Sequence, residues 1–296
     1  MERYVSIDIG GTAIKYGVLD GDGEMVCRSE MRTESYKGGM SILAKAVGIV
    51  EQYSETEAVD GICISTAGMV DTKSGMIFHS APLIPHYSGT RFKETMERKF
   101  RVPCEVENDV NCAGLAESVS GASKGSSSSL MLTVGTGIGG CAIIDGRVFR
   151  GFSNSACEVG YMHMAGSDFQ TLGAASILSR KVAEWKNEPT EKWNGRRIFR
   201  EAQKGDSLCI RAIDEMTDVL GQGIANICYV LNPEVVVLGG GIMSQEEYLG
   251  DRVWKAVEKY LIPSIASRTR LAFAKHRNDA GMLGAFYHFM QRHPQQ

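Results

Sequence analysis

An aspartate, two glycines and a threonine follow the first apolar stretch of the chain, in the order Asp8-Ile9-Gly10-Gly11-Thr12. Adjacent glycines carry no Cβ, so the backbone there can approach a ligand closely. Their N–H groups, together with the Thr12 hydroxyl, could point at a phosphate. A carboxylate at the end of a buried strand is costly unless it meets a cation, and the Mg²⁺ that accompanies a nucleotide would supply one. Taken alone, the segment could also be an ordinary hairpin turn with a solvated aspartate.

The residues on either side of this segment predict a β-hairpin around it. An apolar run at 4–7 precedes the glycines, and a second run at 16–19 leads to an Asp20-Gly21 turn. Two such runs flanking a glycine turn are typical of a hairpin. We therefore expect Asp8 at the end of the first strand and the two glycines in the turn.

The same pattern recurs 125 positions later without a gap, so that Gly10 corresponds to Gly135 and Asp20 to Asp145. An internal repeat changes the fold prediction. One glycine hairpin in each half of the chain indicates two similar domains that face each other across a phosphate.

The second copy also matches a dinucleotide-binding pattern, Gly135-x-Gly137-x-x-Gly140. That pattern must open a helix, whereas this one runs into the apolar stretch 141–144 and an Asp-Gly turn, which predict a strand. We therefore reject the dinucleotide interpretation. The sequence contains no G-x-x-x-x-G-K-[ST] either, which excludes a phosphate loop of the Walker type.

Two carboxylates stand at the ends of other predicted elements. Asn108-Asp109 lies where a strand at 102–106 meets a helix, and Glu158 ends a loop of small residues. From the residues alone, Asp109 could simply cap the helix and Glu158 could be a surface side chain. A carboxylate at such a place could also accept a proton from a hydroxyl during phosphoryl transfer.

Two strand ends are further candidates for ligand binding. A buried strand at 61–65 ends in the turn Thr66-Ala67-Gly68, and a strand at 234–238 ends in three glycines at 239–241. Open α/β sheets bind ligands at the carboxyl ends of their central strands, and glycines allow a flat ring to lie against the backbone. The alternatives are an ordinary turn and the start of a helix.

These motifs resemble those of the ROK family, named for repressors, open reading frames and kinases. Asp8-x-Gly10-Gly11-Thr12-x-x-Lys15 is similar to its first phosphate motif, Gly135-Thr136-Gly137-x-Gly139-Gly140 to its second, and the segment from Glu107 to Glu117 to its E-N-D-x-N-x-x-x-x-x-E element. The resemblance covers essentially the whole chain. It implies an α/β protein with two similar domains of the actin-like ATPase (ribonuclease H-like) fold, a cleft between them, and the use of ATP and Mg²⁺.

The resemblance also implies a role for each matching residue. Asp109 would be the catalytic base that takes the proton from a sugar 6-hydroxyl, and Asp8 would lie near the Mg²⁺ carried by the nucleotide. The residues implied in binding ATP or its phosphates are Asp8, Gly10, Gly11, Thr12, Lys15, Gly135, Thr136, Gly137, Gly239 and Gly240. Those implied in binding the sugar are Thr66, Ala67, Gly68, Asn108, Asp109, Glu158 and Tyr161.

The sequence departs from the family after Glu158. Tyr161 stands where the family has a histidine, and His163 lies two positions further on. The family's C-x-C-G-x-x-G-C zinc loop is replaced by residues 165–173, which contain no cysteine, so zinc is not expected. The second sugar-contacting glutamate of the family corresponds to Leu172 or Gly173.

These losses bear on the acceptor. In the family the missing histidine and glutamate contact hydroxyls near the anomeric carbon, and removing buried polar partners weakens recognition of the group they held. The expected substrate is therefore a small-molecule sugar or disaccharide with a substituent at that end, namely a β-glucoside such as cellobiose, which would give the 6′-phosphate. Glucokinase and N-acetylmannosamine kinase activities are the nearest alternatives.

Composition limits the other classes. The 296 residues, 43% hydrophobic and 23% charged, are typical of a soluble globular protein of two domains. The net charge of −3 gives no electrostatic signature of a nucleic-acid-binding protein, and no apolar run approaches the length of a membrane span. The first predicted strand begins almost at once, which leaves no signal peptide, and the eight cysteines show no C-x-C or C-x-x-C spacing. A cytoplasmic protein with reduced thiols is expected.

We expect an N-terminal domain at 1–118, a C-terminal domain at 119–279, and a last helix at 280–296 that packs back on the first domain. The Gly/Ser-rich stretch 121–129 would be the boundary. The other predicted helices cover 40–53, 91–100, 174–185, 207–229 and 248–261, and a further strand covers 269–274. A homodimer is common in the resembling family.

A transcription regulator and an ATPase without a small-molecule acceptor are the two alternatives from other functional classes. The family includes sugar-responsive transcription regulators, but these carry an additional helix-turn-helix domain, and Met1 lies only seven residues before Asp8. We therefore expect that domain to be absent. An actin-like or chaperone-like ATPase without a small-molecule acceptor is disfavoured by the Asn108-Asp109 and Glu158 elements.

Overall fold

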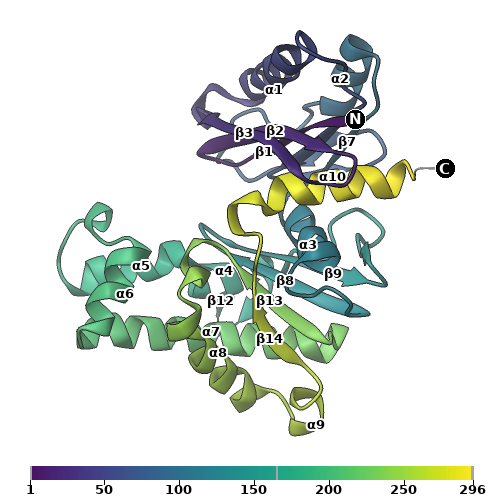
Figure 1. Ribbon diagram of the computed structural model, residues 1–296. Helices are drawn as coiled ribbons and strands as arrows, with labels where there is room; N and C mark the ends of the chain where they lie inside the picture. Colours follow the sequence, from purple (N-terminus) through teal and green to yellow (C-terminus); the bar gives the residue numbers. More distant parts are fainter. Residues whose placement is uncertain (1, 165, 295–296) are drawn as a thin grey trace. The chain divides into compact units, whose positions relative to one another are not determined.

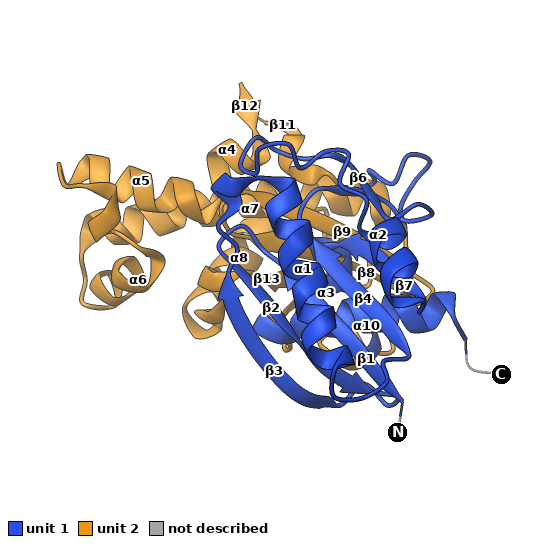
Figure 2. Cartoon of the chain, turned by 90° about the horizontal axis from the view of Figure 1, so that it is seen from above, with its two compact units in different colours: residues 1–119, 150–156, 278–296 blue, residues 120–149, 157–277 orange. Residues whose placement is uncertain are grey.

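The structure, a computed structural model, describes residues 2–164 and 166–294. The chain divides into two compact units, shown in different colours in Figure 2. Unit 1 comprises Met1–Val119, Arg150–Ala156 and Asn278–Gln296, and unit 2 comprises Ser120–Phe149 and Cys157–Arg277. The segment Arg150–Ala156 thus belongs to unit 1, although it lies within the range expected for the second domain. Each unit is described by itself.

Unit 1 is built on a five-stranded sheet with the order β3-β2-β1-β4-β7. The strand β1 pairs antiparallel with β2, which pairs antiparallel with β3, while β1, β4 and β7 run parallel. The strands are β1 (Arg3–Ile9), β2 (Ala13–Asp20), β3 (Met25–Arg32), β4 (Gly61–Thr66) and β7 (Cys104–Asn108). The carboxyl ends of three parallel strands therefore meet at one edge of the sheet, where Ile9, Thr66 and Asn108 are in register.

Helices cover both faces of this sheet: in Figure 1, α1 and α2 lie on one face and α10 on the other. Helix α10 packs against β1, β4 and β7, where Phe286 and Phe289 form a buried cluster with Tyr4 and Leu19. The remaining elements of unit 1 are α1 (Gly39–Ser54), α2 (Phe92–Phe100), α3 (Asp109–Ser120), α10 (Ala280–Arg292), η1 (Ser35–Lys37) and the hairpin of β5 (Met69–Asp71) and β6 (Met76–His79).

Unit 2 repeats the sheet of unit 1, with the order β10-β9-β8-β13-β14. Again an antiparallel hairpin carries a third antiparallel strand on one side and two parallel strands on the other. The strands are β8 (Ser128–Val134), β9 (Ile138–Ile144), β10 (Arg147–Val148), β13 (Val235–Gly239) and β14 (Arg270–Phe273). The repeated order confirms the prediction of two similar α/β domains.

The core of unit 2 is formed between this sheet and its helices. The longest, α7 (Ser207–Leu231), begins at Asp206, whose side chain accepts hydrogen bonds from the backbone of Leu208 and Cys209, and ends at Asn232 in a left-handed conformation. It packs along α8. The other elements are α4 (Phe169–Gly173), α5 (Ala175–Trp185), α6 (Gly195–Gln203), α8 (Glu246–Tyr260), α9 (Pro263–Ala266), η2 (Val159–Tyr161), η3 (Thr190–Lys192), η4 (Gly241–Ser244), β11 (His163–Met164) and β12 (Ser167–Asp168). The short helix η5 (Arg277–Asp279) begins at the last residue of unit 2 and continues with two residues of unit 1.

Across the described residues, 2–164 and 166–294, no helix combines the length and the apolar character that spanning a membrane requires.

Candidate active site

The first glycine turn joins β1 to β2 and is held from behind by Thr33. The Gly10 N–H donates to the Ala13 carbonyl at 3.0 Å. The Thr33 hydroxyl donates to the Gly10 carbonyl at 2.6 Å, and the Thr33 N–H to the Thr12 carbonyl at 2.9 Å. Gly11 and Thr12 are exposed. The turn is therefore fixed on its inner side, while Gly11 and Thr12 present backbone to an incoming ligand.

Asp8 lies one residue before the end of β1, opposite Lys15 on β2. The Ser65 hydroxyl donates to Asp8 Oδ1 at 2.7 Å. Burial raises the pKa of the Asp8 carboxyl, against the opposing effects of the Ser65 hydrogen bond and the Lys15 charge. Lys15 Nζ donates to the Asn278 carbonyl at 3.2 Å, and a side chain at Gly281, in the first turn of α10, would overlap the Asp8 carboxylate.

A Mg²⁺ ion brought by a nucleotide fits this environment. Because burial disfavours the charge of Asp8, the carboxylate gains from a nearby cation. Mg²⁺ in nucleotide sites is commonly held by one or two carboxylates together with the phosphates. The described part of the chain contains no group of three or more His, Cys, Asp or Glu side chains that could hold a metal by itself.

The second glycine turn joins β8 to β9 in unit 2. The Gly135 N–H donates to the Gly137 carbonyl at 2.9 Å, and the Ser176 hydroxyl donates to the Thr136 carbonyl at 2.7 Å. The pair of strand residues nearest the second turn is Val134 and Ile138, whereas the pair nearest the first turn is Ile9 and Ile14. The second turn is therefore one residue shorter than the first.

A cavity of about 440 Å³ opens beside this second turn, within unit 2. It is bounded by the second glycine turn, the start of α6 and the segment after β13, and its lining is Val134, Gly135, Ala175, Asn194, Gly195, Arg196, Phe199, Gly241, Ile242, Ser244 and Gln245. The α6 residues in this lining were not among the residues singled out from the sequence. No motif marks them, and only the folded chain brings them beside Gly135.

The glycines after β13 differ in their surroundings. Gly239 is buried against Met131 and Ala274, and Gly240 has a φ of +101° that a side chain rarely adopts. A Cβ at Gly240 would also overlap the backbone of Val134. Gly241, which follows them, lines the cavity. Gly239 and Gly240 thus allow the backbone after β13 to pass close to β8. This path places Gly241 in the wall of the cavity.

Asn108 and Asp109 lie where β7 ends and α3 begins. Asn108 Nδ2 donates to the Gly68 carbonyl and to Asp109 Oδ1, both at 3.0 Å. Asn108 Oδ1 accepts hydrogen bonds from the backbone N–H groups of Val110 (2.9 Å) and Asn111 (3.1 Å). The Asn108 side chain therefore starts the helix and fixes Asp109 against the turn at Gly68.

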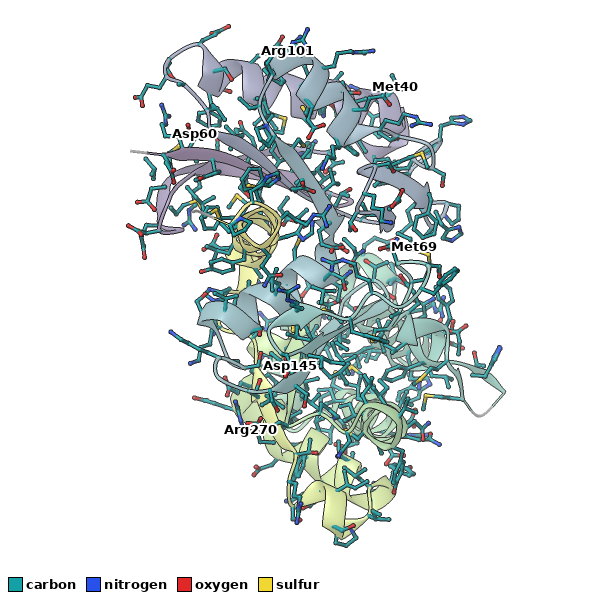
Figure 3. The ribbon with its side chains drawn as sticks, turned by 90° about the vertical axis from the view of Figure 1, so that its right-hand side faces the viewer. Met40, Asp60, Met69, Arg101, Asp145 and Arg270 are labelled. Carbon is teal, nitrogen blue, oxygen red and sulfur yellow. The ribbon has the colours of Figure 1, made fainter. Side chains whose placement is uncertain are left out.

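The turn Thr66-Ala67-Gly68 is packed from two sides. The Thr66 hydroxyl hydrogen-bonds the buried Tyr87 hydroxyl, and burial together with the Asp109 charge raises the pKa of Tyr87, although the Thr66 bond opposes them. The Ala67 N–H donates to the Ile9 carbonyl at 3.3 Å. Met69, which begins β5 directly after the turn, is labelled in Figure 3. Unit 1 thus brings Asp8, the first glycine turn, this turn and Asn108-Asp109 together at one edge of its sheet.

Glu158 and Tyr161 lie in unit 2, at the two ends of η2. Both are exposed, Tyr161 with 52% of its surface accessible. The Tyr161 N–H donates to the Glu158 carbonyl at 3.2 Å. Of the stretch that replaces the family's zinc loop, Ala165 lies outside the described residues, while Leu172 packs partly buried against the core of unit 2.

The repeated sheets and their two glycine turns define an α/β protein of the actin-like ATPase fold. A model of the ROK family matches residues 4–292, and the chain belongs to this family. It is 32% identical over 298 residues to a β-glucoside kinase of Listeria monocytogenes, with 98% of each chain covered.

Two solved structures are also similar to the chain. A ROK family glucokinase from Streptomyces griseus, in complex with glucose and AMPPNP, has a TM-score of 0.83 at 25% identity and covers 96% of this chain and 97% of its own. A ROK family protein from Streptococcus pneumoniae, in complex with sucrose, has a TM-score of 0.85 at 31% identity, with 99% and 100% covered.

Proposed function

We propose that this protein transfers the γ-phosphoryl group of ATP to the 6-hydroxyl of a β-glucoside such as cellobiose, giving the 6′-phosphate. It is a sugar kinase of the ROK family, and the choice of acceptor is the finer part of the proposal. The observation that carries the reaction is the Asn108-Asp109 element, fixed at the carboxyl end of β7 against the turn at Gly68.

Asp109 is the proposed catalytic base. Phosphoryl transfer requires a positioned hydroxyl, a carboxylate to take its proton and neutralisation of the phosphate charge. The bond from Asn108 Nδ2 holds Asp109 Oδ1, and the Val110 N–H donates to the same oxygen at 2.9 Å. A carboxylate held in this way can accept the hydroxyl proton as the oxygen bonds to phosphorus, and Asn108 and Thr66-Ala67-Gly68 orient the ring.

ATP is proposed to be held by groups from both units. Gly10, Gly11 and Thr12 in unit 1 and Gly135, Thr136 and Gly137 in unit 2 would donate backbone or hydroxyl hydrogens to the phosphates. Lys15 adds positive charge beside Asp8. The 440 Å³ cavity beside Gly135 would receive the nucleoside, with Gly239 and Gly240 shaping its wall. Asp8 would hold Mg²⁺, which supplies charge neutralisation for the phosphates.

The β-glucoside is favoured by the side chains that stand near Glu158. Tyr161 is exposed where the family has a histidine, and Leu172, partly buried against the core of unit 2, or Gly173 stands where the family has a second glutamate. The imidazole and the second carboxylate that would hold the anomeric hydroxyl are thus replaced, which favours a substituent on the ring that Glu158 is proposed to bind. The relative from Listeria monocytogenes named β-glucoside kinase supports this choice.

A coupled assay of ADP release tests the proposal with glucose, N-acetylmannosamine, cellobiose and gentiobiose as acceptors. We expect kcat/KM to be highest for a β-glucoside; a higher value for free glucose or N-acetylmannosamine would assign one of those kinase activities instead. Asp109→Asn should lower kcat by about 10²–10⁴-fold while sugar binding is retained. The matched control is Asp206→Asn, because Asp206 also starts a helix but lies at α7. A fully active Asp109→Asn enzyme would refute the role of the base.

A further inference from the structure

We propose that Arg150 is a positioning residue for the phosphoryl transfer: through Glu107 it holds the Asn108-Asp109 element in its reactive place. This inference rests on the proposed function and adds to it a residue from a distant part of the chain. Arg150 follows β10 in the sequence, yet it belongs to unit 1.

Glu107 connects the two. It is the residue before Asn108 on β7 and is 1% exposed. Its Oε1 accepts hydrogen bonds from the Asn108 N–H at 2.8 Å and from Asn111 Nδ2 at 3.0 Å. Its Oε2 accepts from Arg150 Nε at 2.8 Å and lies 2.6 Å from Arg150 Nη2. Oε1 of Glu107 thus fixes Asn108 and Asn111, on either side of Asp109, while Oε2 is held by Arg150.

The surroundings of Arg150 fix its guanidinium. Arg150 Nη2 donates to His288 Nδ1 on α10 at 3.2 Å. Because arginine can only donate, His288 must accept at Nδ1 and carry its proton on Nε2. Burial lowers the pKa of His288 to about 4, so the ring is neutral at physiological pH. The guanidinium is therefore oriented by a neutral acceptor on one side and by the buried Glu107 carboxylate on the other.

The backbone of Arg150 ties a second element to the same point. The Arg150 carbonyl accepts a hydrogen bond from the Ala156 N–H at 3.1 Å, which closes the loop Arg150–Ala156 at its base. Glu158, the proposed sugar ligand, follows two residues after this closure. This closure fixes the backbone of Arg150, from which the side chain reaches Glu107.

The energetics favour a positioning role. A carboxylate as buried as Glu107 keeps its charge only when it is paired and hydrogen-bonded. Without the guanidinium, Glu107 would turn toward other donors, and its support of Asn108 and Asn111 would weaken. A displacement of about 1 Å at a reacting group can cost about 10²-fold in rate.

The same strand offers a matched control two residues earlier. Glu105 is 2% exposed and bonds Lys93 Nζ at 2.8 Å and His293 Nε2 at 2.9 Å. It is a buried, ion-paired glutamate like Glu107, but these bonds go to α2 and to the end of α10 rather than to Asn108 and Asn111. Removing this pair should cost stability without moving Asp109.

The experiment compares neutralised pairs, since removing one partner alone can prevent folding. Glu107→Gln/Arg150→Met removes the first pair, Glu105→Gln/Lys93→Met removes the second, and Arg150→Lys keeps the positive charge but not the planar guanidinium with its fixed set of donors. For each we would measure kcat and KM for the sugar, the Kd of a non-hydrolysable ATP analogue, and the midpoint of thermal unfolding.

We expect kcat to fall by about 10–100-fold in Glu107→Gln/Arg150→Met, with the Kd of the ATP analogue unchanged and a partial recovery of kcat in Arg150→Lys. The Glu105→Gln/Lys93→Met control should keep kcat within about twofold at a comparable loss of thermal stability. Unchanged kcat in the first double variant, or equal losses in both, would overturn the inference. Failure of the wild-type protein to phosphorylate any sugar would instead overturn the proposed function, before any variant is compared.

Discussion

The two glycine hairpins occupy the same place in two sheets of the same strand order, yet they carry different chemistry. Asp8 pairs with Lys15 in the first hairpin, whereas Thr133 pairs with Gly139 at the same place in the second. The last parallel strands differ likewise: β7 buries two glutamates, whereas β14 reads Arg-Leu-Ala-Phe. The hairpin and last parallel strand of unit 1 therefore carry charged side chains, whereas those of unit 2 carry mainly glycines and apolar residues.

This division shows what the repeat preserves. The strand order and the position of the turn recur, because both follow from the glycines and the apolar runs that flank them. The charged side chains do not recur, and the second turn is shorter by one residue. A duplicated scaffold can thus carry charged side chains in one copy and not in the other, and the predictions below test this asymmetry.

Among the tests that compare the two hairpins, the largest effect is expected at Asp8. Asp8→Asn should lower kcat by about 10²–10³-fold, because it removes the carboxylate proposed to hold Mg²⁺ against the phosphates. Thr133→Val, at the matching position of unit 2, should change kcat by less than about threefold. Steady-state kinetics at saturating sugar measure both. Since burial disfavours the Asp8 charge, the asparagine variant should unfold at the same urea concentration as the wild type or a higher one. Equal kinetic losses at the two positions would contradict the division of roles.

A smaller effect, on stability, is expected where the two hairpins differ in their neighbours. A Cβ at Gly17 would overlap the Cys27 carbonyl oxygen on β3, so Gly17→Ala should cost about 2–3 kcal/mol in the free energy of unfolding. The residue 125 positions later, in unit 2, is already Ala142, and it lies beyond the end of the two-residue strand β10. Ala142→Gly should therefore cost only about 1 kcal/mol. Urea unfolding measures both, and a milder effect at Gly17 than at Ala142 would contradict the packing explanation.

The third effect is on the pH dependence of stability. It involves the buried glutamates of β7, which have no counterpart on β14 of unit 2. His288 has an ordinary pKa of 6.5, which burial lowers to about 4 in the folded protein; the Arg150 and Arg292 charges also lower it, while those of Glu107 and Glu105 oppose the shift. Between these values the unfolded chain binds a proton that the folded protein does not. The contribution of neutral His288 to the free energy of unfolding is therefore complete above pH 6.5. It decreases as the pH falls, by about 2 kcal/mol between pH 7.5 and pH 5.

Substitution of His288 isolates this contribution. His288→Gln should make the unfolding free energy less dependent on pH over the same interval, by about 2 kcal/mol. His163 is exposed on β11, so His163→Gln should leave the dependence as it is in the wild type. Urea unfolding at several pH values makes the comparison. The explanation fails if both variants keep the wild-type slope.

The parts of the fold that the sequence predicts best are those with strong local signals. The apolar stripe of α7 predicts a helix at 207–229, and the structure has Ser207–Leu231. The repeated glycines predict both hairpins. Helix α6 was not predicted, although its buried residues Ile198, Phe199 and Ala202 fall at helical spacing; it begins with a glycine, which has a low helix propensity. Strand β3 was not predicted either: it is an edge strand with largely exposed residues and no alternation of polar and apolar side chains.

The candidate site divides in the same way. Asp8, the glycine turns and Asn108-Asp109 stand at strand ends, where short motifs mark them in the sequence. Arg150 and the α6 residues beside Gly135 carry no such mark, because their proximity to the site depends on segments that are distant in sequence. Motifs report local backbone geometry, whereas the support of a carboxylate by a remote arginine is a property of the folded chain.

Helix α10 carries a consequence for how the protein is made. Phe286 and Phe289 of α10 cover Tyr4 and Leu19 of β1 and β2. Strands β1 and β2 are therefore synthesised long before the helix that covers them. Until then the nascent chain exposes an apolar sheet face, and such faces promote aggregation. If synthesis stopped before Ala280, unit 2 would have all its strands, whereas unit 1 would lack helix α10 on one face of its sheet. Rescue by chaperones in the cell should therefore matter most for the part of the sequence that is translated first.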